Sequence, residues 1–300
     1  MMVTETSPLV SSSLMDHTNA TTSPANHTET PFDPFCTGML EGTLVWAVIS
    51  VPCSLVGVIA SAWVLSLLLH DLRDIYMINL TAMDLIFNVS VLPAALCFFL
   101  WRNEVFLKIN DFIYCLSVSG RPLFMVCICV DCFMAVLHPI TYRNLTRSRY
   151  RQVVCMPVWG FTLVYGLMFI FNPQLFITPY MIVPYILSLP AITFCNLSIL
   201  HALRKQDPSG KTDVHPQKQR ALHTITNSFV MAVVSYLPPL VVNVLMPVLP
   251  LTEQQSYCQV GTPFLVGTTL GGTIQPLLYL SHRGHLKNLW GRCGGAPASS

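Results

Sequence analysis

The sequence predicts an all-α membrane protein, a seven-transmembrane helix bundle followed by a short amphipathic C-terminal helix. Of the 300 residues, 53% are hydrophobic and only 10% are charged, whereas soluble domains carry about 25% charged residues. Apolar stretches of roughly 20 residues, the length that a helix needs to cross a bilayer, recur along the chain. The connections between them are too short for a separate soluble domain, so we expect a single transmembrane domain.

The chain divides into three expected parts. These are a disordered extracellular tail over 1–42, the seven-transmembrane domain over 43–281, and a short cytoplasmic helix and tail over 282–300. The first part is rich in Ser, Thr, Asn and Pro and has no Lys or Arg before residue 41, a composition typical of disorder. The seven spans are expected at 43–69, 76–100, 111–138, 152–171, 178–203, 220–248 and 259–281.

The distribution of basic residues predicts the topology. Thirteen of the 16 Lys and Arg follow the first, third, fifth and seventh spans. Arg102 and Lys108 lie on the other side, and Arg121 lies within the third span. Because the basic side of a membrane protein faces the cytoplasm, we expect an extracellular N-terminus and a cytoplasmic C-terminus in the plasma membrane.

Several modifications are expected outside the spans. Asn19 and Asn26 begin glycosylation sequons in the tail. Cys36 and Cys258 precede the first and last spans, which are neighbours in a closed ring of seven helices, so a disulfide between them is expected. Cys293 follows the amphipathic stretch near the C-terminus and is a candidate for palmitoylation; an ordinary free thiol is the alternative.

Two ionised residues lie deep in apolar spans. Arg121 is in the third span and Asp84 is at similar depth in the second. A bare charge costs several kcal/mol in such a place, so we expect the two side chains to form an intramembrane ion pair. In the alternative, Arg121 faces a watery cavity or extends outward, and Asp84 is hydrated separately.

Short motifs recur in order along the spans. They are Asn79-Leu-Thr-Ala-Met-Asp84 in the second, Asp131-Cys132-Phe133 followed by Ala135-Val-Leu-His138-Pro139 in the third, Trp159 in the fourth, Ser235-Tyr236-Leu237-Pro238 in the sixth, and Gln275-Pro276-Leu-Leu-Tyr279 in the seventh. Together these motifs resemble those of rhodopsin-like (class A) G-protein-coupled receptors, over all seven spans. The tail cysteine and the Ala-Val-Leu-His-Pro form resemble the peptide and nucleotide receptor branch.

The resemblance implies roles for the inner half of the bundle. The family usually has Asp-Arg-Tyr, with an Arg that contacts the G protein, where this chain has Asp131-Cys132-Phe133, so the chain is an atypical member. Candidate contacts with a heterotrimeric G protein or arrestin are Asp131, Cys132, Phe133, His138 and Pro139. Candidate switch or hinge residues are Pro238, Gln275, Pro276 and Tyr279.

The resemblance also implies a role for the expected ion pair. In the family the span-2 Asp helps to bind a sodium ion, together with a hydroxyl group on the third span. Alignment on Asp131 puts Arg121 at the position of that hydroxyl group. A fixed guanidinium would then replace the mobile cation, and sensitivity to sodium would be lost.

The resemblance places a ligand site in the outer half of the bundle. Candidate lining residues are Tyr114, Val118, Tyr236, Leu240, Asn243, Leu265 and Thr269. This lining is apolar with a few hydroxyl and amide groups, as small-molecule sites usually are. It includes no Asp from the third span and no Lys or Arg from the sixth and seventh, so we expect a neutral, lipid-like or peptide ligand rather than a biogenic amine, nucleotide or carboxylate.

Other functional classes fit the sequence less well. One alternative is a protein with the receptor fold that does not activate G proteins and acts as a decoy, dimer partner or chaperone, because Cys132 replaces the family's Arg. A channel or transporter is disfavoured, because inverted repeats and further intramembrane acids are absent from the sequence pattern. No phosphate-binding loop, nucleophile–base pair or metal-ligand spacing indicates an enzyme, a cofactor or a metal site, and nothing favours nucleic acid.

Overall fold

The computed structural model describes residues 33–282, apart from 34, 37, 71–73, 146–147, 173–181, 206–215 and 246–247. The chain separates into two units, Met1–Phe32 and Asp33–Ser300, and all described residues belong to the second. Asn19, Asn26, Cys293 and the expected C-terminal amphipathic helix lie outside the described residues.

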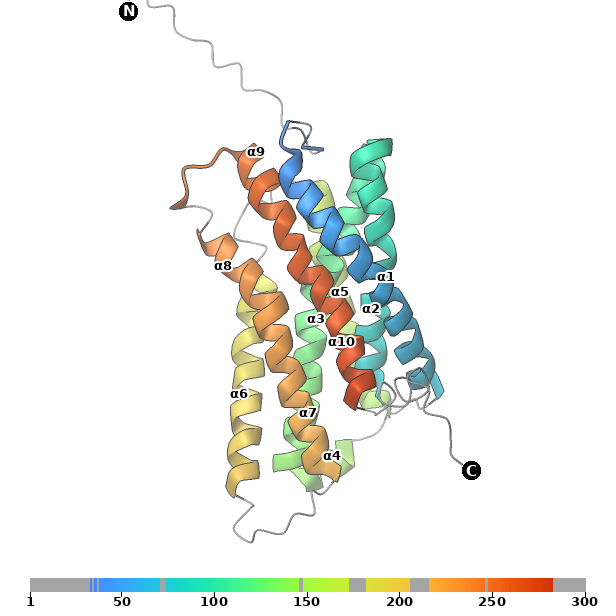
Figure 1. Cartoon of the computed structure of the whole chain (residues 1–300). Helices are drawn as coiled ribbons and strands as arrows, with labels where there is room; N and C mark the ends of the chain where they lie inside the picture. The colour runs from blue at the N-terminus through green and yellow to red at the C-terminus, as the bar shows by residue number, and fades with distance from the viewer. Residues whose placement is uncertain are drawn as a thin grey trace, which may run out of the picture. The chain divides into compact units, whose positions relative to one another are not determined.

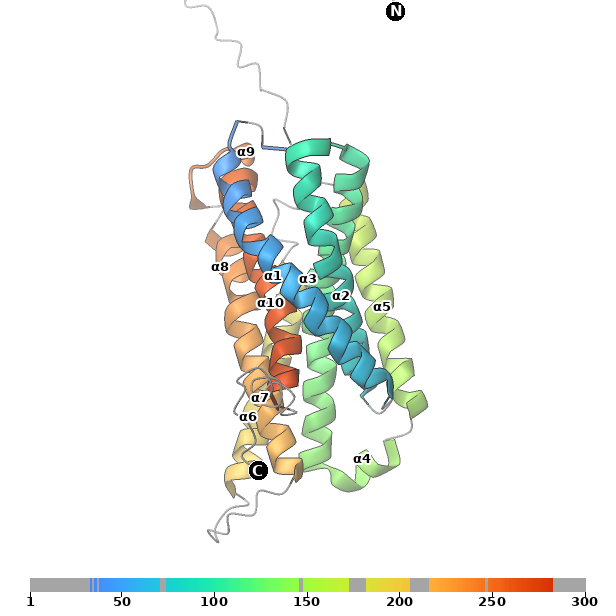
Figure 2. The same ribbon diagram turned by 45° about the vertical axis from the view of Figure 1, so that its right-hand side comes forward.

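The described residues of the second unit form seven helical rods and a short connecting helix, and α3 occupies a central place among the rods (Figure 1, Figure 2). Some rods are continuous α-helices and others combine α- and π-helical segments. Their elements are α1 (Leu40–His70), α2 (Ile75–Leu96) with η1 (Cys97–Trp101), α3 (Glu104–Leu137), α5 (Ser148–Phe171), α6 (Val183–Lys205), α7 (Pro216–Met231) with η4 (Ala232–Tyr236) and α8 (Leu237–Leu245), and α9 (Glu253–Gln255) with η6 (Ser256–Gly261) and α10 (Thr262–His282).

The lengths and compositions of these helices suit a membrane. Six of the described helical segments are apolar and long enough to cross a bilayer. The seventh rod is not among the six, because its α10 helix is rich in Gly and Thr. Large apolar side chains such as Val48, Ile59 and Leu100 are exposed on the outer faces, as expected where lipid is the solvent.

The helix ends differ from the predicted spans by up to seven residues, and the largest difference has a local cause. Helix α3 begins at Glu104, seven residues before the predicted span, because the Asn103 side chain caps it by accepting a hydrogen bond from the Phe106 amide at 3.1 Å. The sequence reasoning also missed the short helix α4 (Pro139–Leu145), which begins with a proline, a residue suited to the first helical position.

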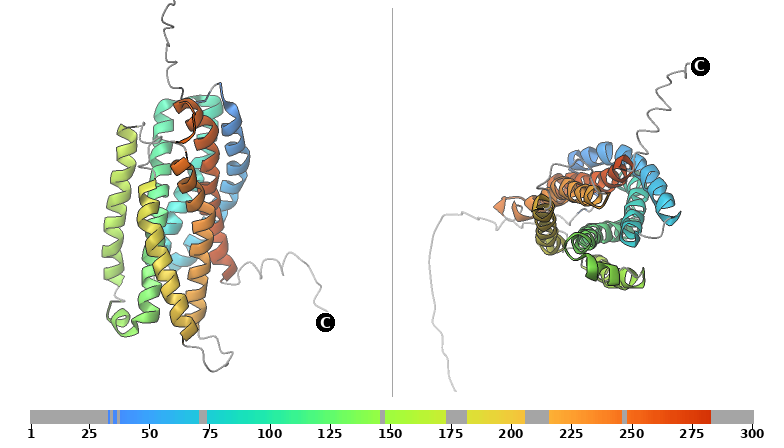
Figure 3. Two further views of the ribbon diagram at one scale, coloured as in Figure 1. Left: turned by 90° about the vertical axis from the view of Figure 1, so that its left-hand side faces the viewer. Right: turned by 90° about the horizontal axis from the view of Figure 1, so that it is seen from below.

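The packing brings sequence-distant helices together. Helix α1 packs against α2 and α10, while α3 packs against α2, α5 and α6. Viewed from below, the rods form a closed group with the first and last helices adjacent (Figure 3). We call the end of the bundle with the start of α1 and α9 the outer end, and the end with α4 the inner end (Figure 1).

Candidate functional site

Arg121 and Asp84 meet in the middle of the bundle. The Nε atom of Arg121 lies 2.6 Å from Oδ1 of Asp84, and the two side chains are 2% and 1% exposed. The Nη1 atom of Arg121 donates a hydrogen bond of 2.5 Å to the backbone carbonyl of Thr268, and the guanidinium carbon lies 4.6 Å from the centre of the Phe87 ring. One side chain of α3 therefore contacts both α2 and α10.

A glycine on α10 makes room for this guanidinium. A Cβ atom on Gly272 would lie 3.1 Å from Cζ and 3.4 Å from Nη1 of Arg121, with Nη2 closer still. The carbonyl of the same glycine accepts a hydrogen bond of 3.1 Å from the Asn88 side chain of α2. The absence of a side chain at position 272 thus lets α10 approach both the ion pair and α2.

The structure brings together part of the expected ligand lining. Val118 and Tyr236 are both buried in one apolar cluster, and Tyr114 packs against it. The Tyr114 side chain adjoins that of Thr268, the residue whose carbonyl binds Arg121. This part of the lining therefore borders the ion pair of Arg121 and Asp84.

Among the described residues, the remaining lining candidates lie outside the apolar cluster that contains Val118 and Tyr236. Leu265 packs against a second cluster that includes Trp46 and Val91. The Thr269 hydroxyl donates to the carbonyl of Leu265 in its own helix, at 3.1 Å. Leu240 is half-buried in α8, and the side chain of Asn243 lies outside the described residues.

Sequence reasoning missed three residues of the outer half. Tyr185 of α6 packs its ring against Tyr236, with 5.6 Å between ring centres, and Tyr257 of η6 lies within electrostatic range of Tyr114 and Asp111. Asp111 is an acid on the third span, contrary to the expected lining. Helical spacing could have identified it, because Asp111, Tyr114, Val118 and Arg121 recur three or four residues apart and so share a face of α3.

At the inner end, Asp131 is engaged by residues beyond its own helix. The Nη2 atom of Arg151, on α5, lies 3.0 Å from both carboxylate oxygens of Asp131. The Tyr142 hydroxyl, on α4, donates to Oδ2 of Asp131 at 3.3 Å and accepts a hydrogen bond of 2.6 Å from Arg151. We call Asp131, Tyr142 and Arg151 the inner triad; it ties α3, α4 and α5 together.

The other inner-end candidates lie around this triad. Cys132 and Phe133 pack against Ile199 and Leu203 of α6. His138, which follows α3, and Pro139, which starts α4, are exposed. An apolar contact between α3 and α6 therefore occupies the position where the family's Arg was expected.

The switch and hinge candidates lie at irregular or buried points of the last two rods. Pro238 follows the π-helical segment η4, so the sixth rod changes helical type two residues before a proline. Pro276 lies inside α10 beside Gln275, whose side chain is buried and makes no hydrogen bond with the described residues. Tyr279 packs near Leu68 and Leu280, at the contact of α10 with α1.

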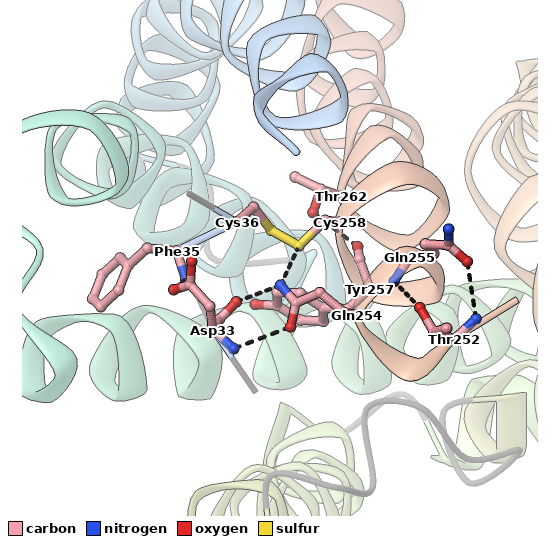
Figure 4. The surroundings of a disulfide bond; sticks show 9 residues. All are labelled: Asp33, Phe35, Cys36, Thr252, Gln254, Gln255, Tyr257, Cys258 and Thr262. Atoms are coloured by element: carbon pink, nitrogen blue, oxygen red, sulfur yellow. Dashed lines mark hydrogen bonds between the residues drawn. A yellow bond between two sulfur atoms is a disulfide. The ribbon is translucent and has the colours of Figure 1, made fainter. Parts of the chain in front are cut away.

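A disulfide joins Cys36 to Cys258 at the outer end (Figure 4). The side chain of Gln254 supports it, because its amide nitrogen donates to the Asp33 carbonyl at 2.7 Å and its oxygen accepts from the Asp33 amide at 3.0 Å. Cys36 adopts a left-handed backbone conformation, with φ of 53°. The segment before α1 is thereby tied to the start of the seventh rod.

Comparison with known proteins shows which family part of this chain resembles. Residues 56–178 match the model of the 7 transmembrane receptor (rhodopsin family). The chain is 38% identical to lysophosphatidic acid receptor 6 of Gallus gallus over 28% of either chain, and 32% identical to lysophosphatidic acid receptor 5 of Bos taurus over 34% of this chain and 28% of the relative. It is 31% identical to proteinase-activated receptor 3 of Homo sapiens over 47% of this chain and 37% of the relative.

The chain thus spans 28% of the length of each of these two lysophosphatidic acid receptors. Motifs in order along the spans, a bundle of seven helical rods and these matches agree with one another. Residues 56–178 are thus similar to the 7 transmembrane receptor (rhodopsin family), and the bundle of seven helical rods among the described residues agrees with that similarity.

Proposed function

We propose that this chain is a plasma-membrane receptor, with its N-terminus outside the cell, that binds a lipid-like or peptide ligand in the outer half of the bundle. Binding shifts the bundle between two conformations and opens its inner end to a heterotrimeric G protein or arrestin. The excess of Lys and Arg after the odd-numbered spans supports this orientation. Names of relatives, which include lysophosphatidic acid and proteinase-activated receptors, support a lipid-like or peptide ligand.

One observation carries the proposal: the outer lining is continuous with the buried ion pair. Tyr114 adjoins Thr268, the Thr268 carbonyl accepts a hydrogen bond from Arg121, and Arg121 pairs with Asp84. A ligand that moves Tyr114 acts on α10 through Thr268, and through Arg121 on α2. Such a chain of contacts is a physical route by which an outer ligand can bias helix packing further in.

The proposal is tested with the full chain carrying an N-terminal epitope tag. Antibody binding to intact cells measures surface delivery and the position of the N-terminus. A library of lipids and peptides is then screened for G-protein activation and arrestin recruitment. We expect at least one compound to act on tagged cells and not on untransfected cells; a surface-delivered chain that responds to none would contradict signalling.

A second candidate function rests on Cys132. This residue packs against α6 in an apolar cluster, and it offers no positive charge to a G protein. The chain would then bind a ligand or a partner receptor without activating G proteins. Comparing the wild type with Cys132→Arg, and with Cys132→Ala as the uncharged control, separates the two functions. If none of the three forms activates a G protein at equal surface level, the second function is favoured. Activation of a G protein by the wild type excludes it.

A further inference from the structure

Two histidines from different rods stack on each other at the inner end of the bundle. His223 lies in α7, and His282 is the last residue of α10. Their ring centres are 3.9 Å apart and their ring planes are inclined by 18°. The two helices lie side by side there (Figure 1), so the stack joins the inner ends of the sixth and seventh rods.

The His282 ring is poorly placed to carry a charge. Its Nε2 atom is buried and makes no hydrogen bond with the described residues. Although His282 lies just beyond the last predicted span, burial lowers its pKa from the ordinary value of 6.5, and the charge that His223 can carry lowers it further. The His282 ring is therefore neutral at pH 7, and a neutral ring can stack without repulsion.

The chain supplies no acid to offset a proton on this pair. From Pro216 to the C-terminus the sequence contains a single acidic residue, Glu253, which lies in α9 at the outer end. Lys218 and Arg220 precede His223 in α7, and Arg283 follows His282. The sequence around the pair is thus cationic, which disfavours a further positive charge.

The other helices packed against α7 and α10 do not change this balance. Among the described residues, the further titratable or charged groups at the inner ends of these elements are His70 of α1, Asp74 and Tyr76 at the start of α2, Asp131 and Cys132 of α3, His201 and Lys205 of α6, and Tyr279 of α10. Asp131 is already held by Arg151. No acid of the described residues acts on the His282 ring, whose only charged influence there is His223.

We propose that His223 and His282 form a proton-binding site that latches α7 to α10 at the inner end, closed when both rings are neutral and opened by protonation. Two imidazolium rings at this separation repel each other, and a protonated Nε2 of His282 needs water that the stacked arrangement excludes. We call the two residues the histidine latch. The inference goes beyond the proposed function, since it concerns helix packing and requires no ligand and no G protein.

The direction of the pH effect follows from linkage. A histidine whose pKa is lower in the stacked arrangement than in the separated one takes up its proton more readily when the helices part. The histidine latch is therefore fully closed above about pH 6.5 and weakens as the pH falls below that value. In the proposed function the same end meets the partner, so acidification of the cytoplasm would favour an open inner end.

The test measures amide hydrogen exchange in the full chain, held in nanodiscs of neutral phosphatidylcholine, at pH 7.5 and pH 5.5. The wild type is compared at each pH with His282→Phe, because the intrinsic dependence of exchange on pH then cancels. Phenylalanine keeps a ring against His223 and removes the second charge, and a protonated His223 is attracted to that ring. For residues 216–231 and 272–282 we expect the ratio of the wild-type rate to the variant rate to rise at least about threefold on acidification.

Two further variants assign the effect to the pair. His201→Gln removes an exposed histidine of the neighbouring helix α6 and should behave as the wild type does. His223→Phe removes the repulsion but leaves the buried Nε2 of His282, so its response to acid should be smaller than that of the wild type; it also serves as the reference if His282→Phe does not fold. The inference is overturned if the ratio does not change with pH, if His201→Gln abolishes the change, or if exchange rises equally in all rods.

The outcome is separate from that of the proposed function. Acid-dependent exchange that requires His282, in a chain that never activates a G protein, supports the histidine latch and contradicts the proposed signalling. Activation by a ligand, in a chain whose inner ends exchange alike at both pH values, does the reverse.

Discussion

The side chain of Arg121 makes three contacts at once, so a substitution of one partner affects the guanidinium and its other partners. Its Nε atom pairs with Asp84, its Nη1 atom donates to Thr268, and its planar group lies over Phe87. Loss of Asp84 leaves the guanidinium buried and uncompensated. Loss of Arg121 leaves a bare carboxylate in the same place.

This geometry makes a double-mutant cycle informative. Asp84→Leu and Arg121→Met should each destabilise the bundle by about 3–5 kcal/mol, because a buried charge loses its partner. The double variant should be more stable than either single variant, because no buried charge remains. Thermal unfolding of the purified forms measures the effect. If the loss of stability in the double variant equals the sum of the losses in the two single variants, the two side chains act separately.

Gly272 gives a second prediction at the same place. Gly272→Ala should destabilise the bundle by about 1–3 kcal/mol, as overpacking of a filled core does, because the new methyl group meets the guanidinium. Gly160→Ala is the matched control, since a Cβ atom there meets nothing within 4 Å and alanine favours a helix over glycine by about 0.5–1 kcal/mol. Equal unfolding temperatures for the two variants would argue against close packing at Gly272.

Some of these residues could be found from sequence and others could not. Asp84 and Arg121 stand out because ionised residues are rare in apolar spans. Asp111 was overlooked because it lies at the edge of its predicted span. Arg151 could not be identified as the partner of Asp131, because their contact depends on how α3, α4 and α5 are joined, which the spacing of apolar residues does not specify.

At the scale of elements, the inner triad determines how α3, α4 and α5 meet. Arg151→Gln should destabilise the bundle by about 1.5–3 kcal/mol, the usual contribution of hydrogen bonds to charged groups. Tyr142→Phe keeps the ion pair and should cost only about 0.5–1.5 kcal/mol. Thermal unfolding of both variants measures the difference. If Tyr142→Phe lowers the stability as much as Arg151→Gln does, the Tyr142 hydroxyl and not the ion pair is the main stabilising group of the inner triad.

The existence of each helical rod is easier to predict from the sequence than the residues at which it begins and ends. Apolar length locates six of the seven described rods clearly, because crossing a bilayer requires a minimum helix length. The seventh is less apolar, and the distribution of Lys and Arg, which requires an odd number of spans, supports it. Apolar length does not locate the start of α3, which depends on the Asn103 cap, or the π-helical segment η4, which precedes Pro238. Helix α4 is short and lies outside the spans, so hydropathy carries no signal for it.

At the scale of the whole molecule, the disulfide joins residues 222 positions apart. Cys36→Ser and Cys258→Ser should each lower the unfolding temperature, and the double variant should match the singles, because either change removes the same bond. A disulfide typically stabilises by about 2–4 kcal/mol. Cys53→Ser, which removes a free thiol, is the control, and a reductant should affect only the wild type and this control.

The bond between Cys36 and Cys258 also turns most of the chain into a covalent ring, since every rod from α1 to α8 lies between the two cysteines. A single protease cut anywhere inside the ring, for example after Lys211, leaves both pieces attached to each other. Such nicked molecules should migrate as one band on a denaturing gel without reductant and as two bands with it. A chain closed in this way stays in one piece after a single cut that would divide a chain without the disulfide.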